Sequence, residues 1–409
     1  MPAMLERWLG ALVLAAPYFE VFSLGPVDLL DLALLPLILV WLPRAARRNR
    51  PLGLGGAELF VALFLLTVWL SLLQARVTEL AAGVRILKRV LYTVVFLWAV
   101  PPTRGEFRAL WRVVFWLCVF SAAVAVGQNV LFWAGWPVWP PEIVKPAYFE
   151  EGPGGLVMLR ASGFTKPGPI SLAIFLGPML AVGASELLFP FLGLPRRRLV
   201  PGLALVALAL YFIHSRDVWL AAAAGAAVPL AARFALSRSP ARWLWATALA
   251  AAAVLLPFAR GLRLTLADLY FKEMLLRGDP EYRLLLFRDA LERLPRFLWL
   301  GCGFERNARF LADAVNMPVH HGFLKVLFER GLPGFLTACL WHLWFVCRVA
   351  GRLATARPEA LATLALWVCY QVIILFEPYD PFHFFLLWPL ALLLTRPGFA
   401  GRHRADREG

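Results

Sequence analysis

Charged residues are scarce in this chain of 409 residues. Only 16% of the residues are charged, 61% are hydrophobic, and the mean hydropathy is +0.69. Soluble domains have about half apolar and about a quarter charged residues. The composition therefore excludes a soluble multidomain protein and predicts an all-α polytopic integral membrane protein.

Cysteine is also rare. Of the five cysteines only Cys302 falls in a polar segment, and no Cys-x-x-Cys pair is present. This excludes a disulfide framework and a thiolate metal pair. Outside the predicted spans there is no Asp-x-Asp pair and no cluster of His and Cys. We therefore expect neither a metal nor a cofactor.

Long apolar runs are abundant. A membrane-spanning helix needs about 20 mostly apolar residues, and fewer where the bilayer thins or flanking side chains snorkel. This criterion predicts about 12 transmembrane helices, at residues 8–23, 27–42, 57–74, 84–100, 107–135, 169–192, 199–214, 218–234, 243–259, 332–349, 359–377 and 382–395.

These spans divide the chain into five parts. Two long external loops separate three groups of transmembrane helices, and the second loop contains helical patterns of its own. The parts are helices 1–5 in residues 1–135, a first long external loop in 136–168, helices 6–9 in 169–259, a second long external loop in 260–331, and helices 10–12 with a tail in 332–409.

Arginine clusters set the predicted orientation. The short loops that contain Arg44–Arg50, Arg196–Arg198 and Arg348–Arg357 all fall on one side of the membrane. The positive-inside rule makes that side cytoplasmic and places both termini there, so the long loops face the outer side of the membrane. The formal charge of +15 resides in these cytoplasmic segments. It indicates membrane lipids and not nucleic acid as the partner.

The second long loop is predicted to contain an amphipathic helix. Asp279 and Pro280 form a helix start, and apolar residues recur at helical spacing up to Pro295. Arg283 shares the apolar stripe, so we expect an anionic partner for it. Arg288 lies in line with acidic residues, and a solvated, ion-paired face explains it as well as substrate binding does.

Two adjacent histidines follow in the same loop. His320 and His321 precede a short predicted helix, Gly322 to Arg330, which leads to Gly331 and the tenth span. A helix N-terminus disfavours an imidazolium, so His320 is expected to be neutral and able to accept a proton. It is a candidate general base toward a sugar hydroxyl, and the alternative is a histidine that only caps the helix.

The spacing around these histidines resembles the O-antigen ligase and O-antigen polymerase family. Ligases of that family have a His followed by Asn, Ser or Gln, then nine residues, Gly, two residues and Gly. His320, Gly331 and Gly334 match this pattern, whereas His321 departs from it. Three further stretches look similar to family segments, and they are Arg160–Phe164, Ser215–Asp217, and Tyr282-Arg283 with Gly301–Phe304.

The resemblance implies an inverting, metal-independent membrane glycosyltransferase of the bacterial inner membrane, with both long loops and the active site in the periplasm. Its donor would be a glycan on a polyprenyl (undecaprenyl) diphosphate, and its acceptor a lipid or glycan such as lipid A-core. Arginines would hold the diphosphate, with His320 as general base and His321 as a further substrate contact. Bidentate guanidinium contacts can stabilise such a leaving group without a metal.

Other cations are candidate diphosphate ligands. Arg160 and Lys166 flank a glycine before the sixth span, and Arg216 lies at a hairpin tip next to Asp217. Snorkelling toward lipid head groups and local ion pairing are the alternatives. A third group shares one helical face at the outer end of the fourth span, where it would meet either the lipid diphosphate or Glu20, Asp28 and Asp31. This group consists of Arg85, Lys88 and Arg89.

A transporter or lipid flippase is the main alternative of another class. Transport sites need ionisable groups or broken helices near the bilayer midplane. Here the midspan candidates are Gln128, Glu186 and Gln371, without an internal repeat. Because the polar chemistry gathers at one face, we favour a ligase-like enzyme, with a polymerase that joins lipid-linked repeat units as the next possibility.

Overall fold

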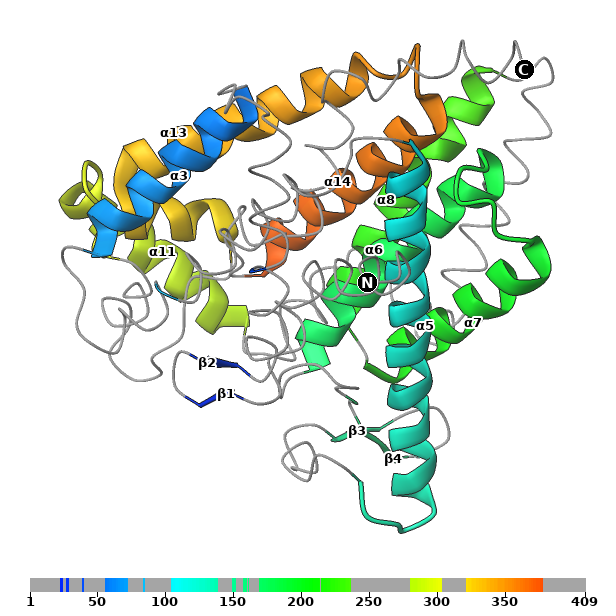
Figure 1. The fold of residues 1–409 in the computed structure, drawn as a ribbon. Coiled ribbons are helices and arrows are strands. Elements are labelled where there is room, and N and C mark those ends of the chain that lie inside the picture. Colours follow the sequence, from blue (N-terminus) through cyan, green and yellow to red (C-terminus); the bar gives the residue numbers. More distant parts are fainter. Residues whose placement is uncertain are drawn as a thin grey trace.

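The structure is a computed structural model of the chain. It describes residues 23–24, 27–28, 39, 56–72, 84, 104–138, 149–151, 157–159, 161, 169–213, 215–236, 280–303 and 321–377. Within these ranges the regular structure is helical apart from four short strands, and turns join several of the helices (Figure 1). The helices are α3 (Gly56–Leu72), α5 (Arg104–Trp133), α6 (Pro169–Leu188), α7 (Arg196–Ile213), α8 (Arg216–Ala235), α11 (Pro280–Phe297), α13 (Gly322–Ala350) and α14 (Arg357–Phe376).

Seven of these helices correspond to predicted spans. Five of them, α5, α6, α8, α13 and α14, contain segments that are long and apolar enough to cross a membrane. α3 has a shorter apolar stretch, and α7 begins with three exposed arginines. The five predicted spans at 8–23, 27–42, 84–100, 243–259 and 382–395 lie largely or wholly outside the described residues.

The two strand pairs are not predicted by the hydropathy pattern. β1 (Ser23–Leu24) pairs antiparallel with β2 (Val27–Asp28), and β3 (Phe149–Glu151) pairs antiparallel with β4 (Val157–Leu159). Each strand has only two or three residues, too few for alternation to stand out from the surrounding loop.

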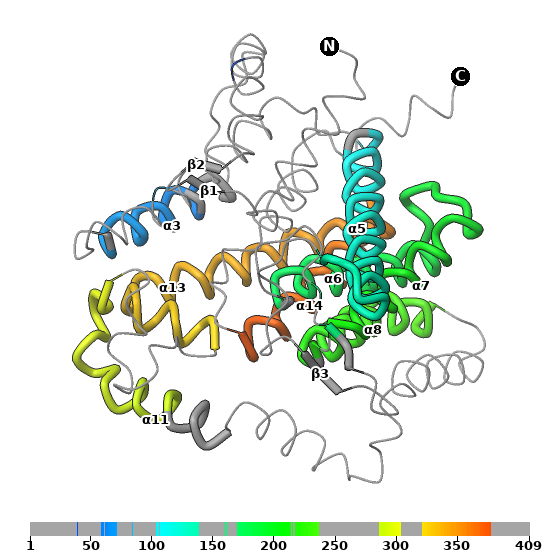
Figure 2. The backbone as a smooth tube through the Cα atoms, turned by 90° about the horizontal axis from the view of Figure 1, so that it is seen from below, coloured from blue at the N-terminus to red at the C-terminus, as the bar shows by residue number. Residues whose placement is uncertain are grey.

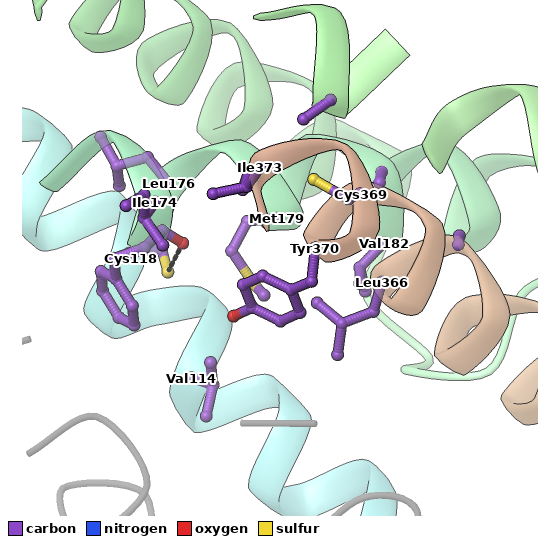
Figure 3. Packing of buried hydrophobic residues seen from close by; sticks show 14 of the residues in the cluster. Val114, Cys118, Ile174, Leu176, Met179, Val182, Leu366, Cys369, Tyr370 and Ile373 are labelled. Carbon is purple, nitrogen blue, oxygen red and sulfur yellow. Dashed lines mark hydrogen bonds between the residues drawn. The ribbon is translucent and has the colours of Figure 1, made fainter. Parts of the chain in front are cut away.

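The densest packing joins α6, α8 and α14, with α5 and α7 beside them (Figure 2). Gly225 of α8 makes this close approach possible, since a Cβ at this position would lie 2.6 Å from the carbonyl oxygen of Ala365 and 2.7 Å from the Cβ of Ala181. Figure 3 shows Tyr370 of α14 among apolar side chains of α5 and α6, including Met179. We call these five helices the core bundle.

Polar contacts tie both ends of α5 to other parts of the chain. Arg104 and Arg108, at the start of α5, lie 3.6 and 3.1 Å from the buried carboxylate of Glu359 at the start of α14. At the opposite end of α5, the Asn129 side chain accepts a hydrogen bond from the backbone N–H of Leu159 in β4 (3.0 Å). These pairs join ends that the predicted topology places on the same side of the membrane.

The remaining helices, α3, α11 and α13, gather at one side of the molecule. Both views show α14 between this group and α5–α8 (Figures 1 and 2). α13 packs along α3 on one side and against α14 on the other, and α11 packs on α13. The candidate site belongs to this second group.

Candidate functional site

α13 is two helical arms joined by a sharp bend (Figure 1). At Gly331 the backbone has φ 64° and ψ −166°, which interrupts the helix. Residues 322–330 form the N-terminal arm and residues 332–350 the C-terminal arm. The Phe323 ring lies 6.3 Å from Phe335 and 5.5 Å from His342 between ring centroids. Because His342 is halfway along the second arm, the N-terminal arm must fold back beside it.

The bend is stabilised by backbone hydrogen bonds from the turn after α11. The N–H groups of Cys302 and Gly303 donate to the carbonyls of Phe328 and Glu329 (2.8 and 3.1 Å). In return, the N–H of Leu332 donates to the carbonyl of Leu298 (2.6 Å). The last carbonyls of a helix have no partner inside it, and here the turn supplies the donors. We call residues 298–303 and 328–332 the joint.

Two glycines are required by the joint. Gly301 and Gly331 have φ values of 74° and 64°, in the left-handed region. A Cβ on Gly301 would overlap the carbonyl of Glu329, and a Cβ on Gly331 would overlap the carbonyl of Trp299. Gly301 and Gly331, which are 30 residues apart in the sequence, therefore lie at the same contact between the turn and α13.

Three charged side chains of the N-terminal arm are buried. Lys325 lies 3.9 Å from the carboxylate of Glu329, one turn further along. The guanidinium of Arg330 lies over the ring of Phe64 in α3, 4.9 Å from its centroid. The Ser71 hydroxyl of α3 donates to the Glu329 carbonyl (3.1 Å). Burial of charge is costly unless it is compensated, and here ion pairing and cation–π contact compensate it.

His321 caps the N-terminal arm. Its Nδ1 accepts a hydrogen bond from the backbone N–H of Leu324 (3.2 Å), and its backbone is extended, as an N-cap requires. Burial lowers the pKa of His321 below its usual value. A ring whose Nδ1 accepts is neutral and has its proton on Nε2, so Nε2–H remains as a donor.

The capping contact explains how His321 replaces the Asn, Ser or Gln of the family pattern. Asn and Ser are among the best N-cap residues because their side-chain oxygens accept from the first free N–H groups. The imidazole Nδ1 supplies the same acceptor. His320 precedes this cap directly in the chain and lies outside the described residues. The described segment therefore begins at the cap residue, His321, directly after His320.

α11 is the predicted amphipathic helix, but the face that it buries differs from the predicted apolar stripe. Leu286 and Ala290 are buried and pack in one cluster with Cys302, Leu324 and Phe328 of the turn and the N-terminal arm. Phe287 and Leu291, which the periodicity assigns to the apolar stripe, are exposed. The difference arises because α11 docks on α13 through one edge of its apolar face. Phe287 borders the His321 ring edge-on at 6.2 Å.

The charged face of α11 forms the expected ion pairs. Arg293 donates to Asp289 (2.6 Å). Arg288 is exposed and pairs with Glu292 (2.8 Å), one of the acidic residues with which it lies in line. The side chain of Arg283 lies outside the described part of the structure.

The side chains of the other candidate cations lie outside the described part of the structure, although some of their neighbours are described. Ser215 begins α8, and its hydroxyl donates to Asp217 (2.8 Å), while the side chain of Arg216 between them is outside the described part. Arg160 is also outside, but its neighbours Leu159 and Ala161 are fully buried. Lys166, Arg85, Lys88 and Arg89 likewise lie outside the described residues.

Sequence reasoning missed the buried charges and His342. The charged residues of the N-terminal arm, Lys325, Glu329 and Arg330, are spaced as in any helix. Their burial results from the packing of α3 and of the turn after α11, which the spacing does not show. His342 lies in an apolar run that reads as an ordinary span. Among the residues that the structure describes, no three His, Cys, Asp or Glu side chains are grouped to hold a metal ion.

Comparison with known protein families identifies one match. Residues 201–339 match the model of the family described as O-Antigen ligase. A comparison with curated proteins gives no match. The matched segment includes the larger part of α7, all of α8 and α11, both motif histidines, the joint and the bend of α13. This match and the five apolar helices indicate a bacterial membrane protein with a glycosyltransferase-like activity of the ligase or polymerase type. Over residues 201–339, the chain is thus similar to the O-antigen ligase family.

Proposed function

We propose that the chain is an O-antigen ligase-like glycosyltransferase. It transfers a glycan from a polyprenyl diphosphate carrier to a sugar hydroxyl of lipid A-core at the outer face of the inner membrane. The observation that carries this proposal is the pair His320-His321 at the start of a broken helix, inside the segment that matches the family. Such a helix start favours the neutral imidazole that a general base needs.

The proposed reaction is an inverting displacement at the anomeric carbon. The acceptor oxygen forms a new C–O bond from the face opposite the diphosphate, and the bond from the anomeric carbon to the diphosphate oxygen breaks. His320 takes the proton of the acceptor hydroxyl, and the diphosphate leaves with the electron pair. His321, whose Nδ1 is engaged with Leu324, uses Nε2–H to donate to a substrate oxygen.

Cations stabilise the leaving diphosphate in this proposal. Arginine offers a planar pair of donors that matches a phosphate, so the diphosphate needs no metal bridge. Arg160, Lys166, Arg216 and Arg283 are the principal ligands that we propose. Arg288 joins them only if it exchanges Glu292 for the substrate. A group at the outer end of the fourth span, Arg85, Lys88 and Arg89, meets the lipid-linked diphosphate at headgroup depth.

Two polar groups of the predicted spans support an enzyme over a transporter. Glu186 lies in the last turn of α6 and not at midspan. It accepts from the backbone N–H groups of Phe191 and Leu192 (2.7 Å each), which fixes the loop after α6. Gln371 contacts the His342 ring (3.3 Å). Both side chains take part in structural hydrogen bonds inside the helix bundle, and a transport pathway would need them along a water-filled route.

Product analysis tests the proposal. Purified protein is incubated with a polyprenyl diphosphate oligosaccharide, with and without a lipid A-core acceptor. The proposal predicts glycosylated lipid A-core only when that acceptor is present. Longer lipid-linked chains without acceptor would mean a polymerase. Movement of the labelled donor across vesicles without any glycosidic product would refute the enzymatic function.

A further inference from the structure

His342 occupies a buried position in the middle of the C-terminal arm of α13. The indole N–H of Trp367 donates to its Nδ1 (3.1 Å), and the side-chain nitrogen of Gln371 lies 3.3 Å from the same atom. The ring of Trp341 stacks on it at 6.3 Å. Trp367 and Gln371 both belong to α14, so His342 joins the two helices.

These contacts determine the tautomer and the charge of the His342 ring. An indole N–H can only donate, so Nδ1 is an acceptor and the imidazole is neutral with its proton on Nε2. The ring is 5% exposed. Its position and orientation are therefore set by α14, independently of the N-terminal arm.

The N-terminal arm meets this ring through Phe323. The phenyl ring packs edge-on against His342 at 5.5 Å. Phe323 lies two residues after the cap His321 and three after His320. The other end of the arm is fixed at the joint, and Phe287 borders His321 from the α11 side. The Phe323–His342 contact links this end of the arm to α14, and so ties the cap residue His321 to the core bundle.

We propose that His342 is a positioning residue for the transfer reaction. Held by Trp367 and Gln371, it supports Phe323 and thereby fixes the N-terminal end of the arm that bears His320 and His321. This inference rests on the proposed function and adds a residue to it. A misplacement of about 1 Å at a catalytic group can cost about 100-fold in rate, so a ring that fixes this end has a large effect on turnover.

A purely structural link between α13 and α14 predicts a different outcome. Loss of that link would lower thermal stability and leave the turnover of the remaining folded protein unchanged. A positioning role instead predicts a loss of kcat that exceeds the loss of folded protein. It also predicts local loosening of the N-terminal arm.

Four variants separate these roles. His342→Asn retains an acceptor for Trp367, His342→Phe retains a ring but no acceptor, and Phe323→Leu removes the ring on the other side of the contact. Leu343→Ala, at the exposed next position, is the matched control. For each, kcat, the KM for the donor, the thermal midpoint and hydrogen exchange of the amides of residues 322–330 are measured in the full-length detergent-solubilised protein.

We expect His342→Phe and Phe323→Leu each to lower kcat about tenfold with a donor KM within about twofold of wild type. Exchange of the arm amides should rise in both. His342→Asn should lower kcat by a similar factor, because the amide keeps an acceptor for Trp367 but lacks the ring against which Phe323 packs, and Leu343→Ala should be unchanged. The double variant His342→Phe/Phe323→Leu should lose no more than the worse single variant, since the two changes interrupt one chain of contacts from α14 to the arm.

Wild-type kcat and wild-type arm exchange in folded Phe323→Leu or His342→Phe would overturn the inference, as would additive losses in the double variant. If His342→Phe does not fold, the same measurements on Phe323→Leu and His342→Asn still test whether His342 positions the arm. Failure of the wild type to make any glycosidic product would instead refute the proposed function. The exchange measurement tests the Phe323–His342 contact in either case.

Discussion

The core bundle and the joint are held together in different ways. In the core bundle, α6, α8 and α14 are continuous apolar helices whose close approach at Gly225 buries side chains against each other. At the joint, the backbone itself is interrupted, and N–H groups of one segment satisfy the carbonyls of another. Buried charges lie beside the joint, whereas the described ion pairs of the core bundle lie at helix ends.

This difference shows where a membrane protein can place chemistry. A continuous helix satisfies its own backbone and presents only side chains, which suits packing in lipid. A broken helix contains non-helical backbone, which is tolerated where protein covers it. The bend of α13 at Gly331 turns the N-terminal arm back beside the C-terminal arm, and so brings the helix start that follows His321 into the fold. The core bundle then serves as the fixed frame against which this N-terminus is placed.

Two glycine-to-alanine variants should separate the two regions. Gly331→Ala puts a side chain at φ 64° and ψ −166°, a backbone region that is essentially restricted to glycine and costs about 1–3 kcal/mol, and it adds an overlap with the carbonyl of Trp299. We expect a loss of transfer of about 100-fold per folded protein, because the arm is displaced. Gly225→Ala should lower the stability of the core bundle by about 1–3 kcal/mol and leave kcat per folded protein nearly unchanged.

Transfer assays and thermal melts on the same preparations provide the check. The comparison of the two regions would be wrong if Gly225→Ala lowered kcat as much as Gly331→Ala did, or if Gly331→Ala retained wild-type transfer.

Two arginines of α11 should differ strongly although both lie on the same helix. Arg283→Lys should reduce transfer about tenfold or more, since one ammonium cannot reproduce bidentate contacts with a diphosphate. Arg288→Lys should stay within about twofold, because an exposed pair with Glu292 is worth only about 0.3–0.5 kcal/mol. Initial rates at saturating acceptor measure the contrast. Equal activities would remove the distinction.

The His321 cap should produce a smaller, pH-dependent effect. Its folded-state pKa is lowered by burial, so the neutral ring and its cap are present above the ordinary pKa of about 6.5 and are lost as pH falls through the lowered folded value. His321→Ala should cost about 0.5–2 kcal/mol at pH 8, and His321→Asn much less. As pH falls below 6.5, the wild type should lose stability relative to His321→Asn, whose amide does not titrate.

Thermal midpoints of the three proteins between pH 5 and pH 8 test this. A pH-independent difference between wild type and His321→Asn would show that His321 does not cap the arm through its neutral Nδ1.

Much of the helical architecture follows from local sequence. Apolar run length predicts α5, α6, α8 and α14 to within a few residues, and Pro280 marks the start of α11. Gly331 marks the break in α13 because few other residues adopt its backbone conformation. These features depend on neighbouring residues, so they can be recognised before any tertiary contact is known.

The assembly of the candidate site does not follow from local sequence. Nothing in the periodicity of residues 322–350 indicates that the first arm folds back onto His342, because a straight helix has the same pattern. Burial of Lys325 and Glu329 depends on α3, whose sequence lies more than 250 residues away. The face that α11 buries differs from the predicted apolar stripe for the same reason, since the contacts with α13 determine which side chains of α11 are covered.

The most direct test of the account is transfer by His320→Ala. Membrane vesicles with equal amounts of wild-type and variant protein are given a polyprenyl diphosphate oligosaccharide and lipid A-core, and glycosylated lipid A-core is quantified. The account predicts normal membrane levels of the variant and a loss of product of at least about 100-fold, because only the proton acceptor is removed. Transfer at the wild-type rate by His320→Ala would contradict it.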